Sequence, residues 1–264
     1  MSALAQAARQ FRFTNKAFWR NPASAFFTFA FPLMFLVIFT SLLGRGEVAI
    51  QGYQLATATY YVGAMAAFGV VSACFTNIAI TTTFNRDQGV LKRLRGTPLP
   101  ASAYMTARVL HATVVGALLV AITLAFGMVA YDSPIPSGMP LVEFVVTFLV
   151  GSLSFAALAL ALTAVIPNAE ASPPIVNAAI LPLLFLSGIF IPLDDEAPVW
   201  MTTIAEIFPV KHFADAMRAG FLGNLESAQG RIFPFDWMDV AITAAWGIVG
   251  LILAARFFSW EPRR

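Results

Sequence analysis

The sequence has very little cysteine and very little charge. Its single cysteine, Cys74, excludes an intrachain disulfide, and no His and Cys residues stand at a metal-binding spacing. Charged residues make up 11% of the 264 residues, hydrophobic residues make up 59%, and the mean hydropathy is +0.77. A soluble domain of this length needs far more polar surface, so this composition excludes a soluble fold.

Two further absences concern catalysis. The sequence contains no Gly-Lys dipeptide, so it has no phosphate-binding loop with which to hold ATP in the usual way. Its two histidines, His111 and His212, have no metal-binding companion at short spacing, and we interpret His212 as a solvated or interface residue. We therefore predict no catalytic residue and no metal site, and any energy for transport must come from another protein.

Charge is also nearly absent from the interiors of the apolar stretches. Ion-coupled transporters keep acidic or basic residues at mid-depth, and many are built from inverted repeats, of which the sequence shows no sign. A secondary transporter and a non-transporting scaffold or immunity protein remain as alternatives. Nothing in the sequence indicates a nucleic-acid partner.

What is present is a series of apolar stretches, each of about 20 residues, the length that crosses a bilayer core. They predict an all-α integral membrane protein with six transmembrane helices in one domain, residues 1–264. The predicted spans are residues 23–43, 59–83, 107–130, 141–166, 173–191 and 237–258. The fourth contains a small-residue tract, GSLSFAALALALTA, which predicts a close helix–helix contact.

The segment before the first span, residues 1–22, reads as an amphipathic helix. Arg9, Lys16 and Arg20 cluster opposite an apolar face. This pattern is typical of a helix in the headgroup region of a membrane, with its basic face toward anionic lipid. We therefore predict an interfacial helix and membrane lipids as partners.

The distribution of Lys and Arg predicts the orientation. With a cytoplasmic N-terminus, 12 of the 16 basic residues but only 3 of the 14 acids lie on the inside. Cytoplasmic loops of membrane proteins carry such an excess of Lys and Arg. Six spans with both termini in the cytoplasm follow from this count.

The polar stretch 84–104 separates the second span from the third. We predict one helix from Phe84 to Arg95, with Leu91 and Leu94 on an apolar face that also carries Asp87. Since a buried carboxylate is costly without a partner, we expect Arg93, Arg95 or a group on another protein to pair with Asp87. The stretch is either an interfacial helix that orients the chain or a docking element for a cytoplasmic partner.

Polar side chains also occur within the spans. The second half of span two is rich in Ser, Thr and Asn, which indicates either close helix packing or the lining of a transport route. Our candidates for a substrate path are Ser72, Thr76, Asn77, Asn177 and Ser187.

Residues 194–236 are too apolar for an ordinary loop. They predict two short helices separated at Pro209, which form an extracytoplasmic hairpin that lies in the outer interface or re-enters the membrane. The candidate residues of this hairpin or gate are Trp200, Phe208, Phe213, Met217 and Phe221.

Two segments resemble one family. The stretch Arg86 to Leu110, RDQGVLKRLRGTPLPASAYMTARVL, is similar to the cytoplasmic signature of ABC-2 type permeases, an acid and Gly-X-Leu followed by a basic cluster and Thr-Pro. FLSGIFIPL (185–193) and FPVKHFADAMRAGF (208–221) resemble the C-terminal half of that family. FLSGIFIPL is closer to drug and lipid exporters similar to daunorubicin-resistance permeases than to polysaccharide exporters.

The resemblance implies the permease subunit of an ATP-binding-cassette exporter in the cytoplasmic membrane. It implies two cytoplasmic ATPase subunits that bind ATP and Mg, and a second permease subunit, identical or paralogous. The substrate would be a lipophilic or amphipathic drug, lipid or glycolipid. The residues that the resemblance assigns to ATPase coupling are Phe84, Arg86, Asp87, Gly89, Leu91, Lys92, Arg93, Leu94 and Arg95.

Overall fold

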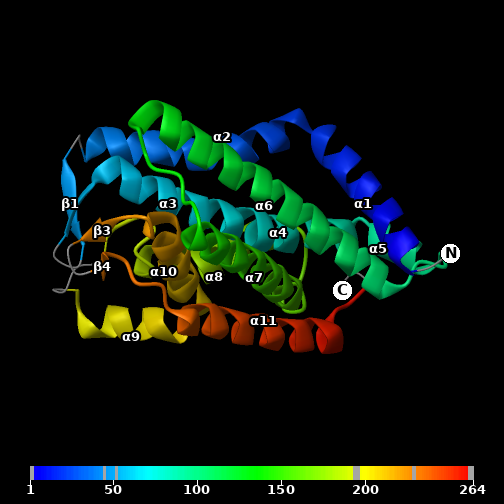
Figure 1. Cartoon of the computed structure of the whole chain (residues 1–264). Coiled ribbons are helices and arrows are strands. Elements are labelled where there is room, and N and C mark those ends of the chain that lie inside the picture. The colour runs from blue at the N-terminus through cyan, green and yellow to red at the C-terminus, as the bar shows by residue number, and fades with distance from the viewer. Residues whose placement is uncertain (1–2, 44–45, 51–52, 193–196, 228–229, 261–264) are drawn as a thin grey trace.

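A computed structural model shows an elongated bundle whose helices run mostly along one axis (Figure 1). It describes residues 3–43, 46–50, 53–192, 197–227 and 230–260. Parts of the predicted N-terminal segment (1–2), of the loop after span one (44–45, 51–52) and of the hairpin (194–196, 228–229) lie outside these ranges.

The described part of the chain is mainly helical, as predicted. Its helices are α1 (Ala3–Trp19), α2 (Pro22–Leu42), α3 (Thr57–Val71), the π-helix η1 (Ser72–Thr76), α4 (Asn77–Asp87), α5 (Val90–Arg95), α6 (Ala101–Tyr131), α7 (Met139–Leu162), α8 (Ser172–Leu186), α9 (Val199–Ile207), α10 (Pro209–Leu222) and α11 (Trp237–Phe257). Its strands are β1 (Glu47–Ile50), β2 (Tyr53–Ala56), β3 (Glu226–Ser227) and β4 (Gly230–Arg231).

The prediction of membrane-spanning helices holds for five of the six stretches. Among the described residues, five helices are long and apolar enough to cross a bilayer: α2, the continuous rod α3–η1–α4, α6, α7 and α11. The fifth predicted stretch forms α8, which has only 15 residues. At 1.5 Å per residue the helix itself extends about 22 Å, so the structure does not confirm this stretch as a sixth span, although the segment from Ala169 to Gly188 contacts both ends of the rod.

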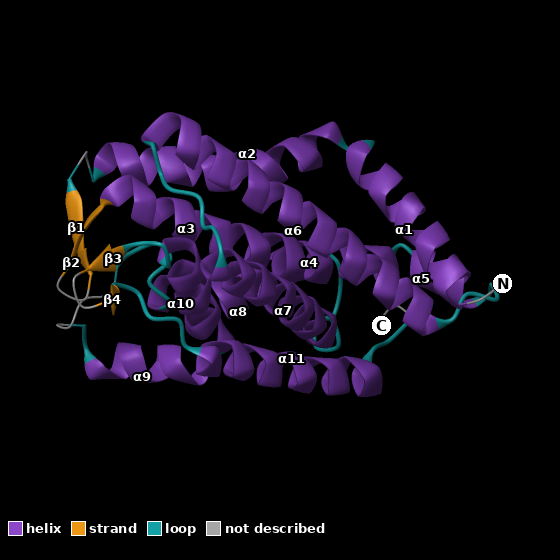
Figure 2. Cartoon of the chain, in the orientation of Figure 1, coloured by secondary structure: helices purple, strands orange, loops and turns teal. Residues whose placement is uncertain are grey.

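The strands correct the expectation of helices and loops alone. β1 pairs antiparallel with β2 between the first two predicted spans, with Val48 opposite Leu55. Residues around Val48 and Leu55 favour extended structure once helix α2 has ended. β3 and β4 form a second short pair, and both pairs lie at the end of the bundle opposite α5 (Figure 2).

The rod α3–η1–α4 forms the centre of the core. In α3 nearly every side chain is buried, including Tyr60, Tyr61 and Met65. α6, α7 and α10 pack around the rod and α2 contacts α3, so this helix crosses the bundle enclosed by protein. By contrast, α2 and α11 leave large apolar side chains such as Phe26, Leu42 and Leu251 exposed. These faces suit contact with lipid or another membrane protein.

The predicted close contact of the small-residue tract is confirmed. It lies on α7, which packs along α11. A methyl group at Gly250 would lie 2.8 Å from the backbone nitrogen of Leu158, and one at Gly247 would lie 2.3 Å from Oγ of Ser154. Because these glycines lack Cβ, the two helix backbones approach closely.

Candidate functional site

The predicted coupling stretch lies at the end of the bundle that also holds α1 and the C-terminal end of α11 (Figure 1). It does not form one helix from Phe84 to Arg95. The central rod ends at Asp87, Gly89 takes a left-handed conformation at φ 70°, and α5 begins at Val90. A glycine adopts this conformation at little cost and commonly ends a helix there. The chain therefore turns, and α5 presents different faces from those predicted.

Arg86 is the main correction in this stretch. We predicted it on the basic docking face, but its side chain is buried at 2% exposure. It donates hydrogen bonds to the carbonyl oxygens of Thr163 at 2.7 Å and Ile166 at 2.6 Å. These carbonyls follow the C-terminal end of α7, where backbone acceptors lack helical partners and favour a cation.

Asp87 makes the matching contact. As expected, its carboxylate has a partner, but the partner is neither Arg93 nor Arg95. Its Oδ2 accepts a hydrogen bond of 2.6 Å from the backbone N–H of Ala169, in the turn between α7 and α8. We call these contacts of Arg86 and Asp87 the Arg86–Asp87 clamp, because they fix the end of the central rod to the α7–α8 turn.

The remaining residues of the stretch divide into an anchor and a surface. The resemblance assigns Leu91 to ATPase coupling, but Leu91 is fully buried within the chain and cannot contact a partner directly, whereas Leu94 is half-buried. Phe84 is 38% exposed. Basic side chains Lys92, Arg93 and Arg95 are exposed on α5. α5 is thus a short cationic surface held to the bundle by its apolar side.

The N-terminal helix supports the same region. Gln6 on α1 donates a hydrogen bond from Nε2 to the carbonyl oxygen of Pro98 at 3.2 Å. Phe11 and Phe18, also on α1, pack edge-to-face against the ring of His111 on α6, with ring centroids 6.2 and 5.4 Å apart. The apolar face of α1 therefore rests on protein.

The candidate path residues do not form one group. Ser72, Thr76 and Asn77 are half-buried on the otherwise enclosed rod, in and beside its π-helical segment. π-helical turns are frequent at functional sites. Asn177 is exposed on α8, whereas Ser187 is buried and its hydroxyl donates to the carbonyl oxygen of Leu184 at 2.8 Å. The first three lie together in one segment of the rod, whereas Asn177 lies on α8, which contacts that segment, and Ser187 follows α8.

The predicted hairpin consists of α9 and α10, divided at Phe208 and Pro209 as expected. α10 is enclosed by α3, α7 and α11, and a helix that re-enters the membrane must be covered by protein in this way. Three predicted hairpin residues are almost fully buried: Phe213, Met217 and Phe221. Trp200 on α9 is 61% exposed, and Phe208 stacks on Trp246 of α11 at 5.6 Å.

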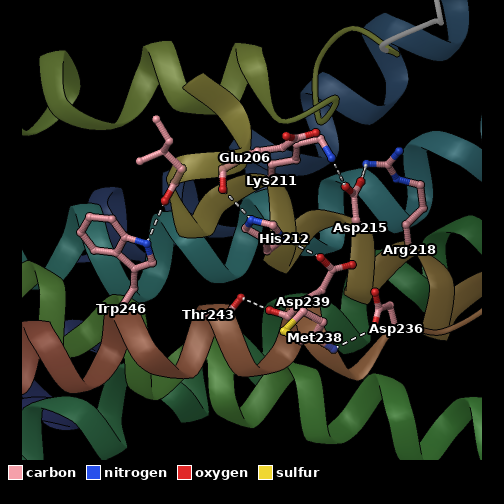
Figure 3. A network of polar contacts seen from close by, with 11 residues as sticks. Glu206, Lys211, His212, Asp215, Arg218, Asp236, Met238, Asp239, Thr243 and Trp246 are labelled. Atoms are coloured by element: carbon pink, nitrogen blue, oxygen red, sulfur yellow. Dashed lines mark hydrogen bonds and ion pairs between the residues drawn. The ribbon is translucent and has the colours of Figure 1, made fainter. Parts of the chain in front are cut away.

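Of the two alternatives for His212, a solvated residue is wrong, whereas an interface residue agrees with its place at the contact of two helices. It is buried between α10 and α11, where Nδ1 lies 2.6 Å from Oδ1 of Asp239 and Nε2 lies 2.8 Å from the carbonyl oxygen of Glu206 (Figure 3). Trp246 adds a bond of 2.9 Å from Nε1 to the carbonyl oxygen of Ile207. These contacts attach the hairpin to α11.

A second group of polar residues attaches the other side of α10. Asp215 pairs with Lys211 at 2.9 Å and with Arg218 at 3.1 Å (Figure 3). The Arg218 guanidinium lies 5.0 Å from the ring centre of Tyr60, whose hydroxyl donates to the carbonyl oxygen of Gly188. The i, i+4 and i+3 spacing within α10 is visible in the sequence, but the contact with Tyr60 joins distant segments and has no sequence signal.

Comparison with known proteins gives a consistent result. The family model for the ABC-2 type transporter matches residues 6–222. The probable multidrug ABC transporter permease YbhR of Escherichia coli K12 is 25% identical over 169 residues, which is 64% of this chain and 45% of that protein. The putative transport permease YvfS of Bacillus subtilis 168 is 25% identical over 235 residues, 89% of both chains. The chain thus spans about half the length of the first relative.

Proposed function

Because this chain belongs to the ABC-2 type transporter family, we propose that it is the permease subunit of an ABC exporter. A separate ATPase subunit, present in two copies, binds ATP and Mg and supplies the energy. The permease pairs with a second copy or a paralogue in the cytoplasmic membrane. α5 and both termini face the cytoplasm, which agrees with the excess of Lys and Arg predicted on that side.

The observation that carries this proposal is the construction of α5. Its cationic side is exposed at one end of the bundle, while Leu91 and the Arg86–Asp87 clamp hold the other side. A surface that only attracted lipid headgroups would need the charge but not the clamp. The clamp makes a displacement of α5 act on the central rod and on the α7–α8 turn together.

Two observations support a proposal for the substrate class and its path: the name of one relative, and the polar segment of the central rod. The name of the Escherichia coli relative refers to multidrug transport, and we propose a lipophilic or amphipathic substrate here. Ser72, Thr76 and Asn77 form the polar segment of its path, since they are half-buried polar side chains on a largely enclosed helix. The α9–α10 hairpin closes the extracytoplasmic end.

Charge reversal on α5 tests docking. The double variant Lys92→Glu/Arg93→Glu changes two exposed side chains and leaves the clamp intact. We expect loss of ATPase co-purification from native membranes, because like charges across an interface suppress association. The matched control is Arg12→Glu/Lys16→Glu, two exposed cations on α1. Equal ATPase recovery with both double variants would reject docking through α5.

A further inference from the structure

The elbow between α1 and α2 contains an apolar groove that the transport proposal does not use. It has a volume of about 420 Å³. Its walls include Trp19, Pro22, Phe26, Phe29 and Ala30, with almost no polar surface. Ligand sites in proteins have volumes of about 300–1,000 Å³ with mainly apolar walls, so the groove has the size of a small binding site.

The groove is preformed by packing around the elbow. The Trp19 indole stacks on Phe29 at 5.8 Å with 15° between the ring planes, and its Nε1 donates to Oδ1 of Asn15. Phe18 packs on the same Phe29 ring. Asn21 caps the first turn of α2 by accepting a hydrogen bond from the N–H of Ser24 at 3.2 Å. The aromatic wall is thus held before any ligand binds.

A row of cations leads to this groove. The helical positions of Arg9, Arg12 and Lys16 place these three on one side of α1, within about 60° of one another, and Arg20 directly follows the end of the helix. All four are exposed, and no described acidic side chain pairs with them. The first acid of the whole sequence is Glu47. Arg20, at the end of the row, is adjacent to the Trp19 wall.

We propose that this elbow is a binding site for one anionic phospholipid. The groove takes an acyl chain, and Lys16 and Arg20 contact the phosphate of the headgroup. The charge decides this ligand class, because an uncharged apolar molecule needs no row of unpaired cations and a cationic one is repelled by it. Trp19, half-exposed between the two parts, suits the membrane interface, where Trp is enriched. This proposal does not depend on an ATPase partner.

Native mass spectrometry of the purified, delipidated chain in neutral detergent tests the site. The probes are phosphatidylglycerol and phosphatidylcholine with the same acyl chains. We expect tighter binding of phosphatidylglycerol. Arg20→Gln should weaken it about fivefold and Lys16→Gln/Arg20→Gln about 30-fold, since each cation near an anionic surface contributes about 1 kcal/mol.

Two further variants make the test specific. Arg256→Gln is the matched control, because Arg256 is also an exposed arginine, in the last turn of the membrane-length helix α11. This variant should bind phosphatidylglycerol with unchanged affinity. Ala30→Phe fills the groove and should weaken binding of both lipids more than tenfold. Arg20→Gln, which alters only an exposed side chain, keeps the test valid if Ala30→Phe fails to fold.

Several results would overturn the proposal. Equal affinity for the two lipids would show that the charge of the headgroup does not contribute to binding. An equal effect of Arg256→Gln and Arg20→Gln would show that the lipid is attracted to any exposed cation and not to this site. Unchanged lipid binding by folded Ala30→Phe would remove the groove. Disulfide-linked dimers of Phe26→Cys in lipid-free detergent would assign the groove to a second copy, since Phe26 is 65% exposed and the native Cys74 is buried.

Discussion

Replacing Arg86 with methionine removes the cationic half of the clamp and keeps an unbranched side chain. Two hydrogen bonds are lost, those to the carbonyl oxygens of Thr163 and Ile166 at 2.7 and 2.6 Å. A further contact to Pro167 at 3.5 Å is too long to contribute much. Hydrogen bonds to charged groups contribute about 1.5–3 kcal/mol each, so the variant loses about 3–6 kcal/mol of interaction between α4 and the α7–α8 turn.

The consequence for transport is specific. Lys92 and Arg93 on α5 remain, so the ATPase should still bind and hydrolyse ATP. The end of the rod is no longer fixed to the turn, and the amount of substrate moved per ATP should fall at least tenfold, since 1.4 kcal/mol already corresponds to a factor of ten. Proteoliposomes containing the permease and its ATPase allow both rates to be measured in one preparation.

Two variants complete this experiment. Arg86→Lys keeps the charge but loses the planar guanidinium that donates to two carbonyl oxygens at once. The ratio of transport to ATP hydrolysis should therefore lie between those of the wild type and Arg86→Met. Arg93→Met removes an exposed cation whose described bond, to the carbonyl oxygen of Gln88, is 3.4 Å long, and the stability of the chain should stay within about 0.5 kcal/mol. A wild-type ratio in folded Arg86→Met would refute the role of the clamp.

Two further predictions concern packing and orientation. Gly250→Ala should destabilise the bundle by about 1–3 kcal/mol, because the added methyl group meets the backbone of Leu158. Gly116→Ala should not, because a methyl group there lies 3.7 Å from its nearest neighbour, a ring carbon of Phe148. Thermal unfolding of both variants measures the difference. An impermeant thiol reagent applied to intact cells should label Gln54→Cys but not Arg95→Cys, and external labelling at residue 95 would contradict a cytoplasmic α5.

Hydropathy predicted the long helices because a bilayer imposes one length and one composition on every span. At α8 the helix is shorter than the predicted span, and this difference has a local cause. The apolar run continues through Phe185–Leu193, so the composition extends the span, but the helix ends at Leu186 and Gly188 turns the chain at φ 74°. The Gly within that run was a visible signal of the end.

The polar residues were harder to place from the sequence. A cation in a basic stretch looks the same whether it meets water or a carbonyl, and the carbonyl partners of Arg86 lie 77 and 80 residues later. His212 likewise pairs with Asp239 on another helix. In both cases tertiary packing decides burial, and only Gly89 gave a local warning that the helix over Phe84–Arg95 would break.

The clamp and the hairpin are attached to the same central rod, and this limits how the permease can change shape. At one end Arg86 and Asp87 hold α4 to the α7–α8 turn; at the other, Tyr60 of α3 contacts Arg218 of α10 and the carbonyl of Gly188 after α8. The rod and α8 are thus joined to each other at both of their ends.

If α5 is pushed by a bound ATPase, α8 and the rod must move as one unit or break buried polar contacts at one end. α2 packs on α3 through apolar side chains such as Phe35 and Phe39, and no described hydrogen bond joins it to the rod or to α8, so these polar contacts do not constrain it. On the proposed function, we therefore expect the relative motion that opens a path to lie between this unit and its surroundings, and not between the rod and α8.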